Sequence, residues 1–239
     1  NLNQKFDVQA ITYGSLIDYT DDRTDPLKGI RFNYNYGDSP QQNADSPDYY
    51  VEEFNLSGYI PIEKSTIALN WYQAGATVRK EGNTDLDSLI TSETARCYAS
   101  CDSATIRSRA ENQQALNRYG SAGGLGGPTR LRSFAQNRYS GPQVEFRGIE
   151  YRWNFSDKET PIDYYIVSDT AINFQLAFFY EEGSIADQKN DLWKEKKSST
   201  GLGFRLVTTS QFVYRIDLAS GQEGNEFIFW FDYPWGAVQ

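Results

Sequence analysis

Carboxylates, arginines and two cysteines are the side chains that could do chemistry in this chain, because its 239 residues include no histidine. Without histidine, Ser-His and Cys-His catalysis and histidine-bound metals are excluded. Asp21, Asp22 and Asp25 could together hold calcium, although a solvated turn is the simpler interpretation of this acidic cluster. We therefore expect no enzyme, no cofactor and no bound metal.

Cys97 and Cys101 lie four residues apart in a segment rich in small and polar residues. This spacing favours a small disulfide loop over two free thiols in a flexible loop, and the lack of histidine argues against a metal site. A disulfide would place the loop in an oxidising compartment, outside the cytosol.

Arg132 follows a glycine-rich run, 119–128, which lacks the Gly-Lys-Ser/Thr ending of a phosphate-binding loop. Alternation places Glu150 opposite an apolar face, and it places Phe179 and Glu181 together on another polar face. Because an unpaired charge in a partly desolvated place costs several kcal/mol, we expect Arg132 to pair with Glu181 and Glu150 and to stack on Phe179. The alternatives are a solvated loop arginine and a hairpin-end carboxylate in water.

Alternation with a period of two runs through most of the chain and predicts the strands that must position these residues. The last stretch places five aromatic residues on one face, namely Phe227, Phe229, Phe231, Tyr233 and Trp235. The nine predicted strands cover 6–19, 28–37, 49–62, 65–79, 143–156, 168–183, 199–208, 211–220 and 225–235.

High aromatic content accompanies low hydropathy: the chain has 17 Tyr, 14 Phe and 5 Trp, yet its mean hydropathy is -0.64. Both a soluble β-sandwich and a transmembrane β-barrel have such a composition, because in a barrel only alternate residues meet lipid. The polar faces mix small residues with Arg, Asp, Glu and Asn, which favours a barrel. Arg215 and Asp217 are then interpreted as charges that keep the barrel interior wet. The net charge of -9 argues against nucleic acid as a partner.

Connections of alternating length support the barrel, since outer-membrane barrels have short turns on one side and long loops on the other. The longest connection, 80–142, shows no clear strand, and its first half is typical of a mobile surface loop. We expect residues 1–239 to form one transmembrane β-barrel domain, with 80–142 as an extracellular loop folding into the lumen.

Several ordered motifs resemble the C-terminal part of the barrel in the BamA-type outer-membrane assembly superfamily. The motif Leu131-Arg132-Ser133-Phe134 resembles its lid loop, and the segment from Phe179 through Glu181 to Gly183 resembles the strand that receives the lid. The aromatic stretch 227–235 resembles the terminal strand that serves as an assembly signal. Similar units occur at 11–36, 49–62, 148–152, 201–205 and 214–219. Ser133 stands where the family usually has Gly, and Glu181 where it has Asp.

The resemblance implies a bacterial outer-membrane location and a barrel of sixteen strands, of which this chain holds the last nine. The alternative is a short family member of eight to ten strands, closing alone or with a second copy. It implies insertion or translocation of proteins as the function. A simple pore, an anchor or a structural barrel is the alternative within the family, and a soluble β-sandwich binding module is the alternative outside it. The implied partners are outer-membrane lipid, unfolded outer-membrane or secreted proteins, and accessory lipoproteins or a second copy.

Overall fold

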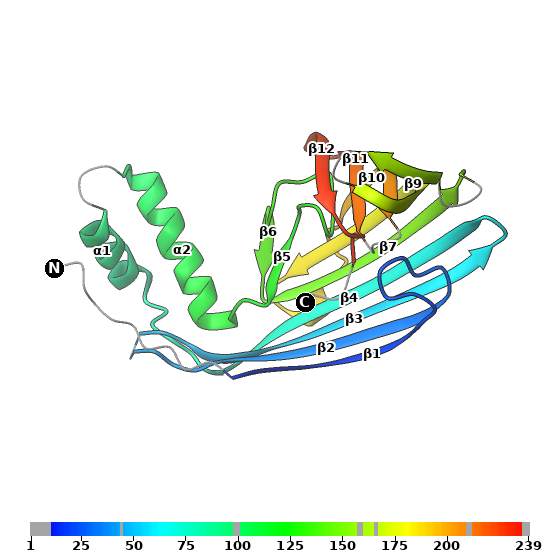
Figure 1. The fold of residues 1–239 in the computed structure, drawn as a ribbon. Coiled ribbons are helices and arrows are strands. Elements are labelled where there is room, and N and C mark those ends of the chain that lie inside the picture. The colour runs from blue at the N-terminus through cyan, green and yellow to red at the C-terminus, as the bar shows by residue number, and fades with distance from the viewer. Residues whose placement is uncertain are drawn as a thin grey trace.

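The computed structural model describes residues 11–43, 45–97, 101–156, 160–164, 167–208 and 212–235. Ten strands form one antiparallel sheet, which curves around a concave face (Figure 1). Nine of them follow one another along the sheet: β1 (Thr12–Thr20), β2 (Gly29–Ser39), β3 (Asp48–Ile62), β4 (Ser65–Lys80), β7 (Gln143–Asn154), β9 (Val167–Ala186), β10 (Lys197–Thr208), β11 (Val213–Gly221) and β12 (Gly224–Phe231). The antiparallel, β-rich architecture predicted from the alternation is confirmed.

The sheet is open, so the described strands do not close into a barrel by themselves. Among the described residues, β1 pairs with β2 alone and β12 pairs with β11 alone. A short strand that was not predicted, β8 (Thr160–Tyr164), pairs with β9 outside the main path. Residues 6–10 of the first predicted strand lie outside the described residues.

Alternation separates the two faces of the sheet chemically. The convex face carries exposed side chains such as Leu202, Phe227 and Phe229, which are 52%, 66% and 54% exposed. The concave face carries polar and charged side chains, and several of them, including Arg205 and Asp217, are completely buried. The sheet therefore has most of its exposed large apolar side chains outside and a set of buried charges inside.

Two helices correct the interpretation of the first half of 80–142 as an irregular loop. They are α1 (Leu86–Arg96) and α2 (Ser103–Tyr119), which form a hairpin standing away from the sheet (Figure 1). Asp85 and Asp102 cap them, each accepting a hydrogen bond from a backbone N–H in the first turn. Both helices bury few residues, so the apolar stripe by which helices are usually recognised is missing.

The second half of this connection lies over the concave face. It contains a small hairpin, β5 (Gly123–Leu125) and β6 (Tyr139–Gly141), and we call residues 123–141 the lid loop. Leu125, Leu131 and Phe134 are buried there in one cluster with side chains of β4 and β7. A short 3-10 helix, η1 (Lys189–Asp191), lies in the connection between β9 and β10.

The chain leaves the sheet after Phe231, earlier than predicted. Asp232 makes the last backbone bond to β11 and adopts a left-handed φ of 62°. Pro234 follows and has no N–H to donate to a strand ladder. Tyr233 and Trp235 therefore turn into the concave face, where they are 8% and 2% exposed, and they do not extend the outward aromatic row. The prediction that they complete the terminal strand is wrong.

Candidate functional site

The lid loop presents Arg132 to the concave face through a tight backbone arrangement. Leu131 has a left-handed φ of 53°, and the Phe134 N–H donates to the Leu131 carbonyl at 3.1 Å. The Gly127 N–H donates to the Phe134 carbonyl at 2.8 Å and holds the base of the turn. Ser133 is not among the described residues with positive φ, so a side chain at this position carries no backbone strain. Serine, in place of the glycine that the resemblance would suggest, is thus compatible with the turn.

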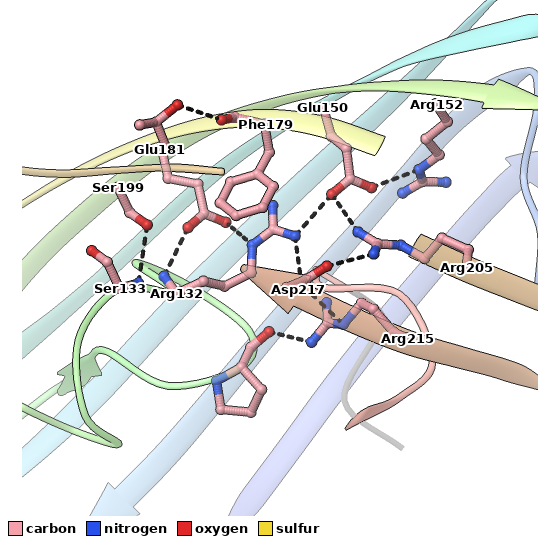
Figure 2. A network of polar contacts seen from close by, with 12 residues as sticks. Arg132, Ser133, Glu150, Arg152, Phe179, Glu181, Ser199, Arg205, Arg215 and Asp217 are labelled. Carbon is pink, nitrogen blue, oxygen red and sulfur yellow. Dashed lines mark hydrogen bonds and ion pairs between the residues drawn. The ribbon is translucent and has the colours of Figure 1, made fainter. Parts of the chain in front are cut away.

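Arg132 is completely buried and contacts three carboxylates (Figure 2). Its backbone N–H and its Nε donate to the two oxygens of Glu181, both at 2.9 Å. Its Nη1 donates to Glu150 and Asp217, also at 2.9 Å. The guanidinium carbon lies 3.4 Å from the centre of the Phe179 ring. The structure thus brings together all the side chains expected to meet Arg132 and adds Asp217.

The carboxylates also bind further arginines, one from β7 and one from β10. Glu150 accepts hydrogen bonds from Arg152 Nε and Arg205 Nη2, both at 2.9 Å. Asp217 accepts from Arg205 Nη1 as well. We call the buried set the inner charge cluster; it consists of Arg132, Glu150, Arg152, Glu181, Arg205, Arg215 and Asp217.

Arg215 and Asp217 were interpreted as charges in a wet interior, and the structure corrects this. Both are completely buried, and Arg215 Nε lies 3.4 Å from an Asp217 oxygen. Arg215 also donates to the carbonyl of Pro128 in the lid loop. They belong to the network that holds the lid. Their polar parity was readable in the sequence, but the pairing was not.

Electrostatics keeps Arg132 charged in this buried place. Burial by itself lowers the pKa of the guanidinium. The nearby carboxylates of Glu181, Glu150 and Asp217 raise the pKa by a larger amount, so the net pKa lies above the ordinary value. A buried pair is favourable only when hydrogen bonds accompany the charges, and Arg132 donates four hydrogen bonds to carboxylates here.

Gly183 and Gly148 provide space for the groups that pack onto the sheet. A Cβ at Gly183 would lie 2.5 Å from a methyl carbon of Leu125 and 3.1 Å from one of Leu131. A Cβ at Gly148 would lie 2.6 Å from the Trp235 indole. The predicted role of Gly183 at the lid thus has a steric basis, because a larger residue would push out the leucines of the lid loop.

Sequence reasoning missed Arg152 and Arg205, although they share the inward parity of Glu150 and Asp217. That parity was the available signal. It identifies the face of a strand but not the partner across the concave face, since Arg132 and Asp217 are 85 positions apart.

Cys97 and Cys101 form a disulfide in the connection between α1 and α2. Asp21 and Asp22 accept backbone hydrogen bonds within their own turn, including one from Lys28 to Asp21 at 2.9 Å and one from Thr24 to Asp22 at 2.7 Å. Asp25 turns away from them to the hydroxyl of Tyr233. The described residues contain no group of three or more His, Cys, Asp or Glu that could hold a metal ion.

The sequence matches no protein-family model, and no curated protein matches it significantly. The resemblance to the outer-membrane assembly superfamily therefore stays a prediction. No helix in the described part of the chain is both long enough and apolar enough to cross a membrane.

Proposed function

We propose that this chain is part of a transmembrane β-barrel of the bacterial outer membrane that inserts or translocates proteins. The observation that carries the proposal is the chemistry of the two faces of the sheet, which is the reverse of that in a protein that folds in water. Phe227, Phe229 and Leu202 are more than half exposed on the convex face, whereas the inner charge cluster is buried on the concave face. In water such a sheet would expose its apolar face, but in a bilayer this face meets hydrocarbon.

The edges of the sheet support a function that involves other strands. Nine antiparallel strands in sequence make β1 and β12 run in the same direction, so their direct pairing would be parallel, unlike the pairing elsewhere in the sheet. An antiparallel strand from another segment or another protein fits both edges. An unpaired edge of this kind templates strand addition.

The lid loop is held in one position over the concave face. Arg132 fixes it to β7, β9 and β11 through Glu150, Glu181 and Asp217. A polypeptide that moves along the concave face must either pass the lid loop in place or displace it as a unit. The ion pairs of Arg132 set the free energy of that displacement.

A reconstitution experiment tests the proposal. The protein in liposomes is mixed with a urea-unfolded outer-membrane barrel protein, and insertion of this client is measured by protease protection. We expect faster insertion than in empty liposomes, and we expect Arg132→Ala and Glu181→Gln to change the rate while Arg107→Ala on exposed α2 does not. Insertion no faster than in empty liposomes would contradict the proposal.

An anchor or structural barrel is the second candidate, and the density of the inner charge cluster favours it. Seven buried charges, the lid loop and the turned-in Tyr233 and Trp235 fill the concave face. For an anchor, Arg132→Ala lowers stability but leaves client insertion at the rate of empty liposomes. The same reconstitution therefore separates the two functions.

A further inference from the structure

A groove on the convex face lies between β2, β3, β4 and β7 and has a volume of about 480 Å³. Its walls are aliphatic side chains that are all about half exposed, namely Ile30, Leu56, Leu69 and Ile149. The volume lies within the range of ~300–1,000 Å³ that is usual for ligand pockets. The face would be smooth if every outward position of these strands carried a large side chain.

Gly58 creates the hollow. It lies in β3 opposite Ile30 on β2 and Leu69 on β4, at an outward position between Leu56 and Ile60. A Cβ placed there would have no heavy atom within 4 Å, so the space above it is open. Gly58 thus leaves a gap in the outward apolar row between Leu56 and Ile60.

One end of the groove is lined by charged groups of both signs. Arg147 and Glu182 are neighbours across β7 and β9, and both line the groove. The side chain of Arg147 is 60% exposed and pairs with Glu145 at 2.9 Å, and Lys196 pairs with Glu182 at 2.6 Å. Two bases and two acids meet here, so this end has no net charge.

An indole lies beside this end of the groove, in contact with Arg147. Trp193, from the connection between β9 and β10, donates from Nε1 to Glu145 at 2.8 Å, and its ring lies 4.3 Å from the Arg147 guanidinium carbon. Tryptophan indoles concentrate at the boundary between hydrocarbon and headgroups in membranes. The groove thus runs from an apolar surface to an indole and a balanced pair of charges.

We propose that this groove binds one acyl chain of a zwitterionic phospholipid, with the phosphate beside Arg147 and the ammonium beside Glu182. The inference rests on the proposed membrane location. Charge complementarity decides the headgroup, because an anionic lipid would meet Glu145 and Glu182 as well as Arg147. A larger groove shares Ile149 and Tyr180 with this one, but the residues that line it include no base to hold a phosphate.

Lipid retention by the purified protein tests the inference. The protein in detergent is mixed with phosphatidylethanolamine or phosphatidylglycerol of the same acyl chains, and bound lipid is counted by native mass spectrometry. We expect phosphatidylethanolamine to be retained preferentially. Gly58→Phe fills the hollow and should weaken retention by about tenfold, equivalent to roughly 1.4 kcal/mol. Ser15→Phe, which adds the same bulk at an outward position of β1 away from the groove, should leave retention unchanged.

Two conservative variants at the charged end test the headgroup and do not depend on whether Gly58→Phe folds. Arg147→Gln should weaken retention of phosphatidylethanolamine, and Glu182→Gln should shift the preference towards phosphatidylglycerol. Equal retention by the wild type and Gly58→Phe, or headgroup preference unchanged in both charge variants, would overturn the inference. A bound peptide in place of lipid would overturn it as well. A chain that stays monodisperse without detergent would instead overturn the proposed membrane location.

Discussion

Tyr233 and Asp25 are 208 positions apart in the sequence, yet the Tyr233 hydroxyl donates to the Asp25 carboxylate at 2.5 Å. Asp25 belongs to the turn between β1 and β2, and Tyr233 follows β12, so the contact joins the two edge hairpins of an open sheet inside its concave face. Gln175 of β9 completes the contact, with its Nε2 lying 3.3 Å from Asp25. The Tyr233 ring also lies 3.8 Å from the Arg152 guanidinium carbon and so reaches the inner charge cluster.

Removing this hydroxyl should destabilise the sheet without disturbing its packing. Tyr233→Phe keeps the ring beside Arg152 and removes the shorter of the hydrogen bonds to the Asp25 carboxylate, which costs about 1.5–3 kcal/mol for a hydrogen bond to a charged group. The free energy of unfolding in detergent, measured with urea, checks this. Tyr19→Phe, on a side chain that is 80% exposed, is the control. Equal unfolding midpoints for the two variants would show that the contact contributes nothing.

Arg132→Ala should destabilise the protein by about 3–5 kcal/mol, because it leaves the buried Glu181 without its guanidinium partner. Glu181→Gln removes the carboxylate charge, so the double variant should be more stable than the sum of the single effects predicts. Arg107→Ala breaks only an exposed pair with Glu111 and should cost less than about 1 kcal/mol. Additive effects at Arg132 and Glu181 would mean that the two do not act as a pair.

Gly183→Val should displace the lid loop, because the new side chain takes the space of Leu125 and Leu131. Overpacking of this kind costs about 1–3 kcal/mol. Limited proteolysis between β5 and β6 reports the displacement directly. Gly37→Val, at a strand position with open space around it, is the matched control. The prediction fails if both variants are cut at the wild-type rate.

The contact between the lid loop and the turn joining β11 to β12 should weaken in acid. Hydrogen bonds from Arg138 and Tyr139 lower the pKa of Glu223 below its ordinary value. A carboxyl with a lowered pKa in the folded state contributes stability above its unfolded pKa of ~4.3. That contribution is lost as the pH falls through the folded value.

The hydrogen-exchange protection of the 222–223 turn, taken relative to the intrinsic exchange rate at each pH, should therefore fall below about pH 4 in the wild type. In alkali the Tyr139 hydroxyl should keep its proton, and so its hydrogen bond to Glu223, to a higher pH than an ordinary tyrosine would. The reason is that burial and the hydrogen bond to Glu223 raise the pKa of Tyr139 to about 12. Glu223→Gln has no carboxyl to titrate, so its exchange should show no such acid step. An acid step of the same size in Glu223→Gln would assign the titration to another group.

The disulfide should stabilise the helical hairpin alone. Cys97 and Cys101 close a small loop between α1 and α2, for which chain entropy gives about 2 kcal/mol. Replacing both by Ser should speed hydrogen exchange in α1 and α2 and leave the strands unchanged, because the hairpin stands away from the sheet (Figure 1). Faster exchange in β4 and β7 would contradict this independence.

The strands were predictable because alternation is a local property, written in each stretch of the chain. The terminal segment shows its limit: the aromatic alternation continues to Trp235, but Asp232 and Pro234 end the pairing at Phe231. The two helices were missed because they show no periodic apolar pattern. They bury so little, chiefly Leu89 and Ala110, that only the caps mark them in the sequence.

For the candidate site, the sequence predicted which face of its strand each residue lies on, but it did not predict all of the ion pairs that these residues form. Parity placed Glu150, Phe179 and Glu181 on the inside, and an arginine expected in a partly desolvated place required a carboxylate partner. That Asp217 serves both Arg132 and Arg205 depends on how β7, β9, β10 and β11 align across the curved sheet. Such alignment is set by tertiary structure, so it becomes readable only when the strands are placed.

Which face of the sheet meets hydrocarbon is tested most directly by spin labels attached to single added cysteines, since the native pair is disulfide-bonded. Labels at Ile149, Leu202 and Phe229 are compared, in liposomes, with one at the exposed Ala115 of α2. Collisions with oxygen, which concentrates in lipid, and with a water-soluble nickel chelate are measured by power saturation. The account predicts dominant oxygen collisions at the three convex-face sites and dominant nickel collisions at Ala115. Dominant nickel collisions at all four sites, or protection of the convex-face sites from both reagents, would contradict it.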